Sequence, residues 1–300
     1  MADRAKLIAL DWGTTSLRAY LLGADGAVLE RREAPLGILN VEGGDFARAF
    51  RGATEGWPRA PALAAGMIGS RQGWREAPYV ECPAGLGDVA RRLLAVEGAA
   101  LRIAPGVSLI DADGVPDVMR GEETQIFGAC GPGESGIAVL PGTHSKWALV
   151  EGGRIRRFAT FMTGEAFAAL SEHTILGRLF EGCAPDEAAF ARGVAHAALE
   201  EKGRGGLLHR LFSARTLGLL GKLPGASLRS YLSGLLIGAE LAEALAWLDD
   251  APTRVTVIGG AALARSYRAA LEQRGVAAGL APPDAAATGL LRIARAAGMV

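Results

Sequence analysis

The sequence predicts an α/β protein of two similar lobes, and three observations support this fold class. The chain has 300 residues, enough for two domains that each bury a core. Short apolar segments joined by glycine turns occur as a set twice, from residue 7 and from residue 137. Helix-length segments fill the rest of each half. We therefore expect lobes at 1–130 and 131–300, with the boundary at the glycine-rich segment 131–136.

The first half begins with a predicted β-meander. An apolar strand starts at Leu7, a Gly-Thr turn follows at 13–15, and a second strand covers about 17–22. A turn at 24–26, with the sequence Ala-Asp-Gly, leads into a third strand. The next lobe is predicted to begin in the same way.

The second half repeats this order in the run IAVLPGTHSKWALVEGGRIRRF, which begins at residue 137. The residues that align without a gap are Gly13, Thr14 and Ser16 with Gly142, Thr143 and Ser145. Each lobe would then present a turn of glycine and hydroxyl residues toward a common interlobe cleft.

The remaining predicted elements of the second half are mostly helices. Ser227 is expected to cap a helix that ends near Leu248. The later elements, in chain order, are a break at Pro252, a strand over 254–258, the pair Gly259-Gly260, a helix from Ala261 and a last helix over 285–297.

Composition narrows the class of partner and the compartment. Lys and Arg together number 32, as do Asp and Glu, so no basic field exists to attract nucleic acid or an anionic membrane. The cysteines stand far apart without a Cys-x-x-Cys pair, which suits a reducing cytoplasm: Cys82, Cys130 and Cys183. We expect a small-molecule partner, and the sequence leaves open whether the chain acts as a monomer or a homodimer.

Neither of the two most apolar stretches predicts a membrane-spanning segment or an export signal. The apolar run near the N-terminus is four residues long and meets Asp11, which is too short for a signal-peptide core. The apolar stretch 228–248 contains Arg229, Glu240 and Glu243, so we interpret it as a buried helix.

The first turn is a candidate site for phosphate and Mg²⁺. Asp11 ends a predicted strand, and Gly13, Thr14 and Thr15 follow with hydroxyls and backbone N–H groups of the kind that phosphate oxygens need. The carboxylate of Asp11 suits a hard cation that prefers oxygen ligands. A solvated Asp in an Asx-type turn is the alternative.

The second turn offers similar groups to the transferring phosphoryl group. Its candidate ligands are Gly142, Thr143, His144 and Ser145. A hairpin with surface His and Lys is the alternative, and only the pairing with the first turn favours the functional interpretation. Gly259 and Gly260, between a strand and a helix, would let adenine or ribose approach the backbone, although without the two upstream turns a plain strand-to-helix turn is the favoured interpretation.

Two further segments could serve the acceptor substrate. Glu122 and Glu123 open a predicted helix, where acids are favoured electrostatically, but either could also accept the proton of an attacking hydroxyl. Asp117 and Asp11 are rivals for that role. The glycine-rich segment 66–74 supplies Ser70, Arg71 and Trp74, of which Arg71 could bind a carboxylate with two hydrogen bonds. The segment 160–165 could contribute hydroxyl and carboxylate groups, or Glu165 could simply start a helix.

Several familiar motifs are excluded by their context. The segment GPGESG at 131–136 fits the dinucleotide pattern G-x-G-x-x-G, yet a strand is predicted after it where that motif needs a helix. No G-x-x-x-x-G-K-[ST] loop, H-E-x-x-H pair or G-x-S-x-G elbow occurs.

The two Gly-Thr turns and the late Gly-Gly resemble the phosphate and adenosine motifs of the sugar kinase, hsc70 and actin superfamily, whose actin-like (ribonuclease H-like) ATPase fold has two lobes. Within it, the chain resembles the 2-dehydro-3-deoxygalactonokinase family most closely. The segments that carry this resemblance are, in order, DWGTTSLRAYLL, GMIGSRQGW, MRGEETQIFGA, LPGTHSKWALV, FMTGEAF, SGLLIGAEL and VIGGAAL.

The resemblance implies transfer of a phosphoryl group from ATP, with Mg²⁺, to the terminal hydroxyl of 2-dehydro-3-deoxy-D-galactonate in galactonate degradation. By position, 11–15 would be the first phosphate motif, 142–145 the second and Gly259-Gly260 the adenosine motif. Related sugar kinases have a catalytic Asp in Gly-Asp-Gln where this chain has Gly121-Glu122-Glu123, so the base stays open between Glu122 and Glu123.

Three alternatives stay open at this point. The gluconate epimer of the substrate differs at one stereocentre, which first principles do not separate. A phosphohydrolase on the same scaffold would release phosphate from ATP or polyphosphate with water. A sugar sensor without catalysis would usually need a DNA-binding element, and no basic helix precedes Leu7.

Overall fold

The computed structural model of the chain describes residues 5–197, 205–248, 252 and 254–300. Within these ranges the fold is α/β with mixed sheets, as the sequence predicted. The chain divides into two compact units. Unit 1 comprises residues 1–138, 148–158 and 281–300, and unit 2 comprises 139–147 and 159–280.

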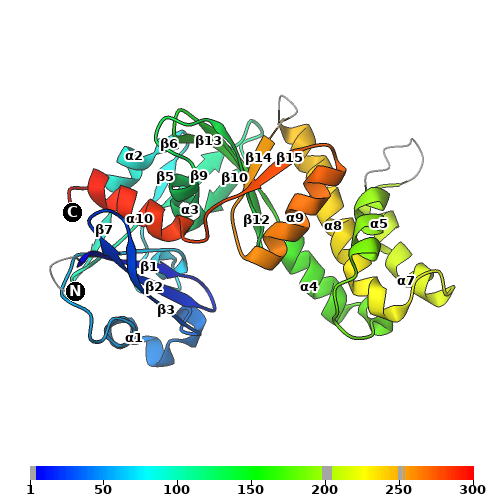
Figure 1. Cartoon of the computed structure of the whole chain (residues 1–300), viewed down its shortest axis with the longest axis horizontal. Coiled ribbons are helices and arrows are strands. Elements are labelled where there is room, and N and C mark those ends of the chain that lie inside the picture. The colour runs from blue at the N-terminus through cyan, green and yellow to red at the C-terminus, as the bar shows by residue number, and fades with distance from the viewer. Residues whose placement is uncertain (1–4, 198–204, 249–251, 253) are drawn as a thin grey trace. The chain divides into compact units, whose positions relative to one another are not determined.

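This division differs from the predicted lobes 1–130 and 131–300. The last twenty residues return to unit 1 because helix α10 (Ala285–Ala296) packs on helix α3 (Glu122–Ala129) and on strand β1 (Ala5–Trp12). Figure 1 shows α10 beside α3. The second predicted meander is also divided, since its strands carry residues of both units. The order of strands along the sequence predicts neither the return of the last helix to unit 1 nor the division of the second meander.

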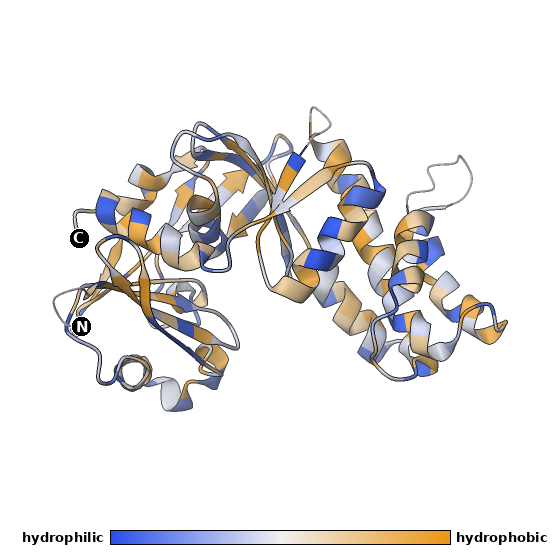
Figure 2. Cartoon of the chain, viewed as in Figure 1, coloured by the Kyte–Doolittle hydropathy of each residue, from blue (hydrophilic) through white to orange (hydrophobic). Residues whose placement is uncertain are grey.

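The main sheet of unit 1 contains the first meander and a parallel extension. Its strand order is β3 (Val28–Ala34), β2 (Leu17–Gly23), β1, β4 (Ala62–Ala65), β8 (Leu101–Ile103) and β7 (Leu94–Val96). β1, β2 and β3 pair antiparallel as predicted, whereas β1, β4 and β8 run parallel. Figure 2 shows the strongly apolar runs of β1 and β2 that form its core. Burial on both faces explains why these strands read as continuous apolar runs.

Helix α3 is held against α10 by close backbone contact. A Cβ at Gly128 would lie 1.7 Å from the carbonyl oxygen of Ala285, and a Cβ at Gly289 would lie 1.7 Å from that of Thr124. Only glycine allows two helices to approach this closely. The N-terminus of α3, which carries Glu122 and Glu123, is therefore fixed by the C-terminal helix.

The described residues form two further sheets, a small one of three strands and a larger one whose strands carry residues of both units. A three-stranded sheet has the order β10 (Pro116–Met119), β9 (Gly106–Ile110) and β5 (Tyr79–Glu81). A six-stranded sheet has the order β15 (Ala277–Leu280), β14 (Arg254–Val257), β11 (Gly136–Leu140), β12 (Ser145–Glu151), β13 (Arg154–Phe161) and β6 (Ala84–Gly85). The predicted second meander is β11 to β13, and strand β11 follows the segment 131–136 as expected.

The remaining helices are short apart from those of unit 2. Unit 1 also has α1 (Phe46–Ala53) and α2 (Leu86–Ala90), with 3-10 turns η2 (Ile38–Asn40), η3 (Glu42–Gly44) and η4 (Met67–Gly69). Unit 2 has α4 (Thr163–His173), η5 (Gly177–Leu179), α5 (Glu187–Ala197), α6 (Leu207–Leu211), α7 (Ser213–Leu219), α8 (Gly225–Trp247) and α9 (Ala261–Gln273).

Helix α8 confirms the buried helix predicted for 228–248 but begins earlier than expected. It starts at Gly225, after Pro224, and Ser227 donates its hydroxyl hydrogen bond to Asp186 instead of capping the helix. A nearby carboxylate thus competes with the predicted cap. None of the helices in the described ranges is long and apolar enough to span a membrane.

Candidate functional site

The sheet of unit 1 delivers Asp11 to one edge. β1 and β4 run parallel with Asp11 opposite Ala65, so both strands end at the same edge of the sheet. Ligands of α/β proteins commonly bind outside the carboxyl ends of parallel strands. The predicted phosphate turn, residues 13–15, follows directly and lies at this edge.

The first turn is held by the segment that contains η2. The carbonyl oxygen of Gly13 accepts from Ile38 N at 3.0 Å, and that of Thr14 accepts from Leu39 N at 3.2 Å. The carbonyl oxygen of Thr15 accepts from Asn40 Nδ2 at 3.2 Å. Across a trans peptide the C=O and the next N–H point in opposite directions. The N–H groups of residues 14–16 therefore point away from this segment, as in an anion-binding nest.

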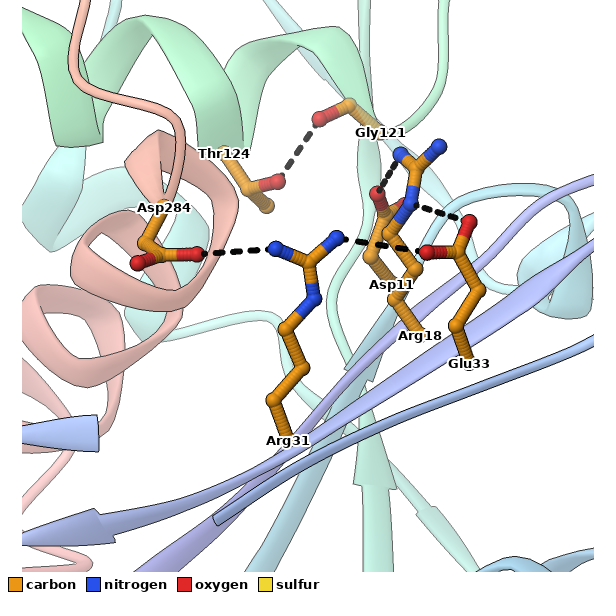
Figure 3. Close-up of polar contacts among 7 residues, drawn as sticks. All are labelled: Asp11, Arg18, Arg31, Glu33, Gly121, Thr124 and Asp284. Carbon is orange, nitrogen blue, oxygen red and sulfur yellow. Dashed lines mark hydrogen bonds and ion pairs between the residues drawn. The ribbon is translucent and has the colours of Figure 1, made fainter. Parts of the chain in front are cut away.

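Asp11 combines burial with neighbouring charge. Its side chain is 16% exposed, and Oδ2 lies 3.5 Å from Arg18 Nη1 (Figure 3). Burial raises the pKa of the Asp11 carboxyl, the Arg18 guanidinium lowers it, and the carboxylate of Glu122 raises it. The interaction with Glu122 places a second carboxylate near Asp11.

Three predicted segments meet at the backbone of Gly66. Gly66 has a φ of 95°, and a Cβ there would lie 2.7 Å from the carbonyl oxygen of Trp12. A Cβ on Gly121 would lie 3.0 Å from the Cα of Gly66. The first turn, the glycine-rich loop 66–74 and the N-terminus of α3 are thus brought together within unit 1.

The two acidic residues of α3 occupy different environments. Oε2 of Glu122 accepts from Arg120 N at 2.9 Å, and this side chain is half-buried. Oε2 of Glu123 accepts from Gly121 N at 2.7 Å, and the residue is fully buried. Its Oε1 has no hydrogen-bond partner among the described residues. Both carboxylates accept hydrogen bonds from backbone N–H groups of the residues just before the helix, and only Glu122 has a partly accessible side chain.

Burial gives Glu123 an unusual protonation equilibrium. Desolvation, reinforced by the negative charge of Glu122, raises the pKa of Glu123 to about 8. A carboxyl of this pKa is mostly neutral at pH 7. Glu123 therefore fits a structural role better than the role of a base that must be ionised to accept a proton.

The loop 66–74 separates its three candidate residues. Arg71 is 88% exposed, and its Nε lies 3.6 Å from Oε1 of Glu76. The Trp74 ring stacks on Phe46 at a centroid distance of 6.3 Å and packs on the core of unit 1. Oγ of Ser70 is buried without a hydrogen-bond partner in the described part of the chain. Arg71 alone presents a charged group to solvent.

The second turn lies against the N-terminus of α4 within unit 2. Glu165 N donates to the carbonyl oxygen of Thr143 at 3.0 Å, and Glu165 Oε2 lies 2.5 Å from His144 Nε2. A Cβ at Gly164 would lie 2.4 Å from the carbonyl oxygen of Gly142. The segment 160–165 therefore contains the start of a helix, one of its two interpretations, and this start packs against the second turn.

Ser145 differs from its expected position as a phosphate ligand. Its side chain is fully buried, and its hydroxyl donates to Oε1 of Glu240 at 2.7 Å. Glu240 interrupts the apolar stretch of α8 in the sequence, which is the signal that could have identified it. The residues that donate hydrogen bonds to Glu240 could not be named from that signal.

The candidate adenosine motif lies next to the second turn. Ile258 N donates to the carbonyl oxygen of Val139 at 2.8 Å, and a Cβ at Gly259 would lie 3.5 Å from that of Pro141. Gly260 precedes α9, and no atom lies within 4 Å of a Cβ placed there. Unit 2 thus brings 142–145, 163–165 and 259–260 together.

The oxygen donors at Asp11 fit a hard divalent cation. Asp11 supplies a carboxylate, the ligand type that Mg²⁺ prefers while it keeps several waters. In the described ranges no group of three or more His, Cys, Asp and Glu side chains forms a metal cage.

The chain matches one family over nearly its whole length. A family model described as 2-keto-3-deoxy-galactonokinase matches residues 11–293. A probable 2-dehydro-3-deoxygalactonokinase of Rhizobium meliloti (strain 1021) is 39% identical over 279 residues, 89% of each chain. The 2-dehydro-3-deoxygalactonokinase of Escherichia coli (strain K12) is 36% identical over 278 residues, 90% of this chain and 91% of its own.

Solved structures give the same result. A crystal structure from Sinorhizobium meliloti, named as a candidate 2-dehydro-3-deoxygalactonokinase, is 38% identical with a TM-score of 0.86 and covers 97% of this chain and 98% of its own. The activator of the 2-hydroxyisocaproyl-CoA dehydratase from Clostridium difficile, 12% identical, reaches a TM-score of 0.53 over 97% of this chain and 95% of its own. At that identity the similarity establishes a shared fold alone.

Proposed function

The chain belongs to the 2-keto-3-deoxy-galactonokinase family, and from this premise we propose that it transfers the γ-phosphoryl group of ATP to 2-dehydro-3-deoxygalactonate. The acceptor is the terminal, 6-hydroxyl group of this sugar acid, within galactonate breakdown. The enzyme is a phosphotransferase with an alcohol acceptor.

The observation that carries this proposal is the geometry of the first turn. The carbonyl oxygens of 13–15 are bonded to residues 38–40, so the N–H groups of 14–16 face the other way, beside the carboxylate of Asp11. This arrangement suits phosphate oxygens with a divalent cation. We assign Gly13, Thr14 and Thr15 to phosphate contacts and Asp11 to Mg²⁺. Bound Mg²⁺ would neutralise charge on the phosphates.

The second turn and the Gly259-Gly260 pair, both in unit 2, give independent support for nucleotide binding. Gly142, Thr143 and His144 lie against the N-terminus of α4, where the helix dipole favours an anion. Gly259 lies beside Pro141, which precedes this turn, so one ligand could contact both segments with its phosphates and its nucleoside. Thr143 and His144 are our candidate side-chain contacts to phosphate.

Phosphoryl transfer needs a group that orients the hydroxyl and accepts its proton. We assign this role to Glu122, because Glu123 is fully buried and its pKa is raised to about 8. The 6-oxygen forms a bond to the γ-phosphorus as the bond to the bridging oxygen of ADP breaks, and the hydroxyl proton passes to Glu122. Arg71, exposed on the loop next to Gly66, would bind the substrate carboxylate with two hydrogen bonds.

The two strand meanders support the finer fold assignment. β1 to β3 and β11 to β13 each place a glycine-threonine turn after their first strand. We propose that they are equivalent elements of an actin-like ATPase fold, in which the predicted lobes 1–130 and 131–300 descend from one repeated unit.

A coupled ADP-release assay tests the function. The purified protein is given ATP and Mg²⁺ with 2-dehydro-3-deoxygalactonate, with its gluconate epimer, or with neither acid. We expect turnover with the galactonate compound and little with the others. Equal release in all three reactions would contradict the kinase proposal in favour of hydrolysis by water, and preference for the epimer would overturn the substrate assignment.

A further inference from the structure

A single buried carboxylate in unit 2 receives hydrogen bonds from three different elements. Oε1 of Glu240, on α8, accepts from Ser145 Oγ at 2.7 Å and from Trp147 Nε1 at 2.8 Å. Oε2 accepts from Tyr267 Oη, on α9, at 2.5 Å. Glu240 is 3% exposed, and the other three residues are almost fully buried. Nothing in the proposed reaction uses Glu240 directly.

The donors belong to the elements that carry the candidate nucleotide contacts. Ser145 follows Gly142, Thr143 and His144 without a break, and Tyr267 lies on the helix that begins after Gly260. The hydroxyl of Thr163, the first residue of α4, also hydrogen-bonds Glu240. The second turn, the start of α4 and the middle of α9 therefore share one anchor.

The chemistry of the anchor matches a carboxylate. Trp147 can only donate, and the hydroxyls of Ser145 and Tyr267 are free to donate as well. A carboxylate accepts at both oxygens, so it can satisfy all of these donors at once. Such a buried network rigidifies the segments that it joins.

We propose that Glu240 is a positioning residue for nucleotide binding, which holds the second turn in place through Ser145 and holds α9 through Tyr267. The inference rests on the proposed function and refines it, because Ser145 then serves as the anchor point of the turn and makes no contact with phosphate. Glu240 itself touches neither ATP nor the sugar acid.

Two pairs of matched variants separate positioning from stability. Ser145→Ala removes a buried serine hydroxyl that donates to a carboxylate, and Ser227→Ala removes another, directed at Asp186 in the same unit. Tyr267→Phe deletes one buried phenol hydroxyl, and Tyr231→Phe deletes another, which contacts Ser213 and His196. Each control should lower the melting temperature as much as its partner.

The readouts are the KM for ATP, the KM for the sugar acid and direct binding of ATP with Mg²⁺ by calorimetry. Ser145→Ala and Tyr267→Phe should each weaken ATP binding, by about 10- to 100-fold where the turn moves by 1 Å, with the KM for the sugar acid unchanged. Ser227→Ala and Tyr231→Phe should leave both constants unchanged. Glu240→Gln keeps an oxygen that can accept from Ser145 and Trp147, and Tyr267 Oη can accept from its NH2 group, so this variant should retain most of the affinity.

Several outcomes would overturn the inference. If Tyr267→Phe behaved like Tyr231→Phe while Ser145→Ala weakened ATP binding, Ser145 would be a direct phosphate ligand. If all four variants changed only the melting temperature, the network would be purely structural. Failure of the proposed function would give a different result. If the wild type bound ATP but phosphorylated no sugar acid, the proposed kinase function would be wrong, while the role of Glu240 in ATP binding could still hold. Absence of ATP binding by the wild type would overturn both.

Discussion

Arg18 lies between two acids, with Nη1 at 3.5 Å from Oδ2 of Asp11 and Nε at 3.1 Å from Oε1 of Glu33 (Figure 3). Arg31 continues this chain of alternating charges from Glu33 to Asp284. The exposed pairs contribute little stability by themselves. Their effect falls on Asp11, whose pKa burial raises and Arg18 lowers.

Removal of this positive charge should change the pH dependence of activity. In Arg18→Gln the pKa of Asp11 should rise further, so Asp11 would lose its charge at a higher pH and the acidic limb of the profile should move upward. The measurement is kcat/KM for ATP with Mg²⁺ between about pH 5 and pH 8, where a charge next to a carboxyl shifts its pKa by one unit or more. Arg31→Gln, which contacts Glu33 but not Asp11, is the control and should keep the wild-type limb. An unshifted limb in Arg18→Gln would contradict the prediction.

Glu122 should be needed for the chemical step. Glu122→Gln keeps the size of the side chain but removes its capacity to take a proton, and we expect kcat to fall by about 10²- to 10⁴-fold. The KM values for ATP and the sugar acid should change little. Glu123→Gln should remain active at pH 7, since the amide mimics a neutral carboxyl. The opposite ranking of the two variants would assign the base to Glu123.

Glu123 should also make stability depend on pH. Its pKa is about 8 in the folded chain against an ordinary 4.5. Between these values the unfolded chain has lost the proton that the folded chain keeps, so the free energy of unfolding should fall as pH rises, by at most about 1.4 kcal/mol per pH unit. Glu123→Gln should abolish this slope relative to the wild type.

Urea denaturation at pH 5, 6, 7 and 8 measures the slope. Glu151→Gln alters an exposed carboxylate and should leave the wild-type slope intact. Parallel curves for the wild type and Glu123→Gln would show that Glu123 ionises normally.

The contact between α4 and the second turn should tolerate no side chain at residue 164. A Cβ in Gly164→Ala would meet the carbonyl oxygen of Gly142 at 2.4 Å, so the turn must move. We expect ATP binding, followed by calorimetry, to weaken by about tenfold or more. Gly136→Ala, where no atom lies within 4 Å of the added Cβ, should bind ATP as the wild type does. Normal affinity in Gly164→Ala would argue against a nucleotide contact at this turn.

Arg71 should act on the sugar acid alone. Arg71→Ala removes an exposed guanidinium, and we expect the KM for the sugar acid to rise by about 10-fold or more, as for loss of a charged hydrogen bond, with the KM for ATP unchanged. Arg71→Lys should recover only part of the affinity, because an ammonium group cannot form the two-point contact. Arg75→Ala, an exposed arginine on the same loop, is the control. A wild-type KM in Arg71→Ala would exclude its proposed role.

Local patterns predicted much of the fold. The strands of each meander occur in the predicted order, and the strand at 17–23, the strand at 254–257 and the helix at 285–296 lie within one residue of their expected limits. Glycine turns and apolar alternation involve only a few neighbouring residues, so they can be predicted from the sequence. The unit boundaries could not be predicted, because α10 packs on α3 across more than 150 residues of sequence. The hydrogen bond from Arg292 to the carbonyl oxygen of Phe127 is one such contact.

The sequence alone determined which segments offer phosphate-binding chemistry, since residue type and spacing specify turns, hydroxyls and acids. The tertiary structure decided what each group does. Ser145 donates to Glu240, 95 residues away, so its hydroxyl is buried, although it was expected to contact phosphate at the turn. Glu122 and Glu123 are identical in chemistry and adjacent in sequence, yet burial raises the pKa of Glu123. Hydration and long-range hydrogen bonding depend on what surrounds a side chain after folding, which residue order does not state.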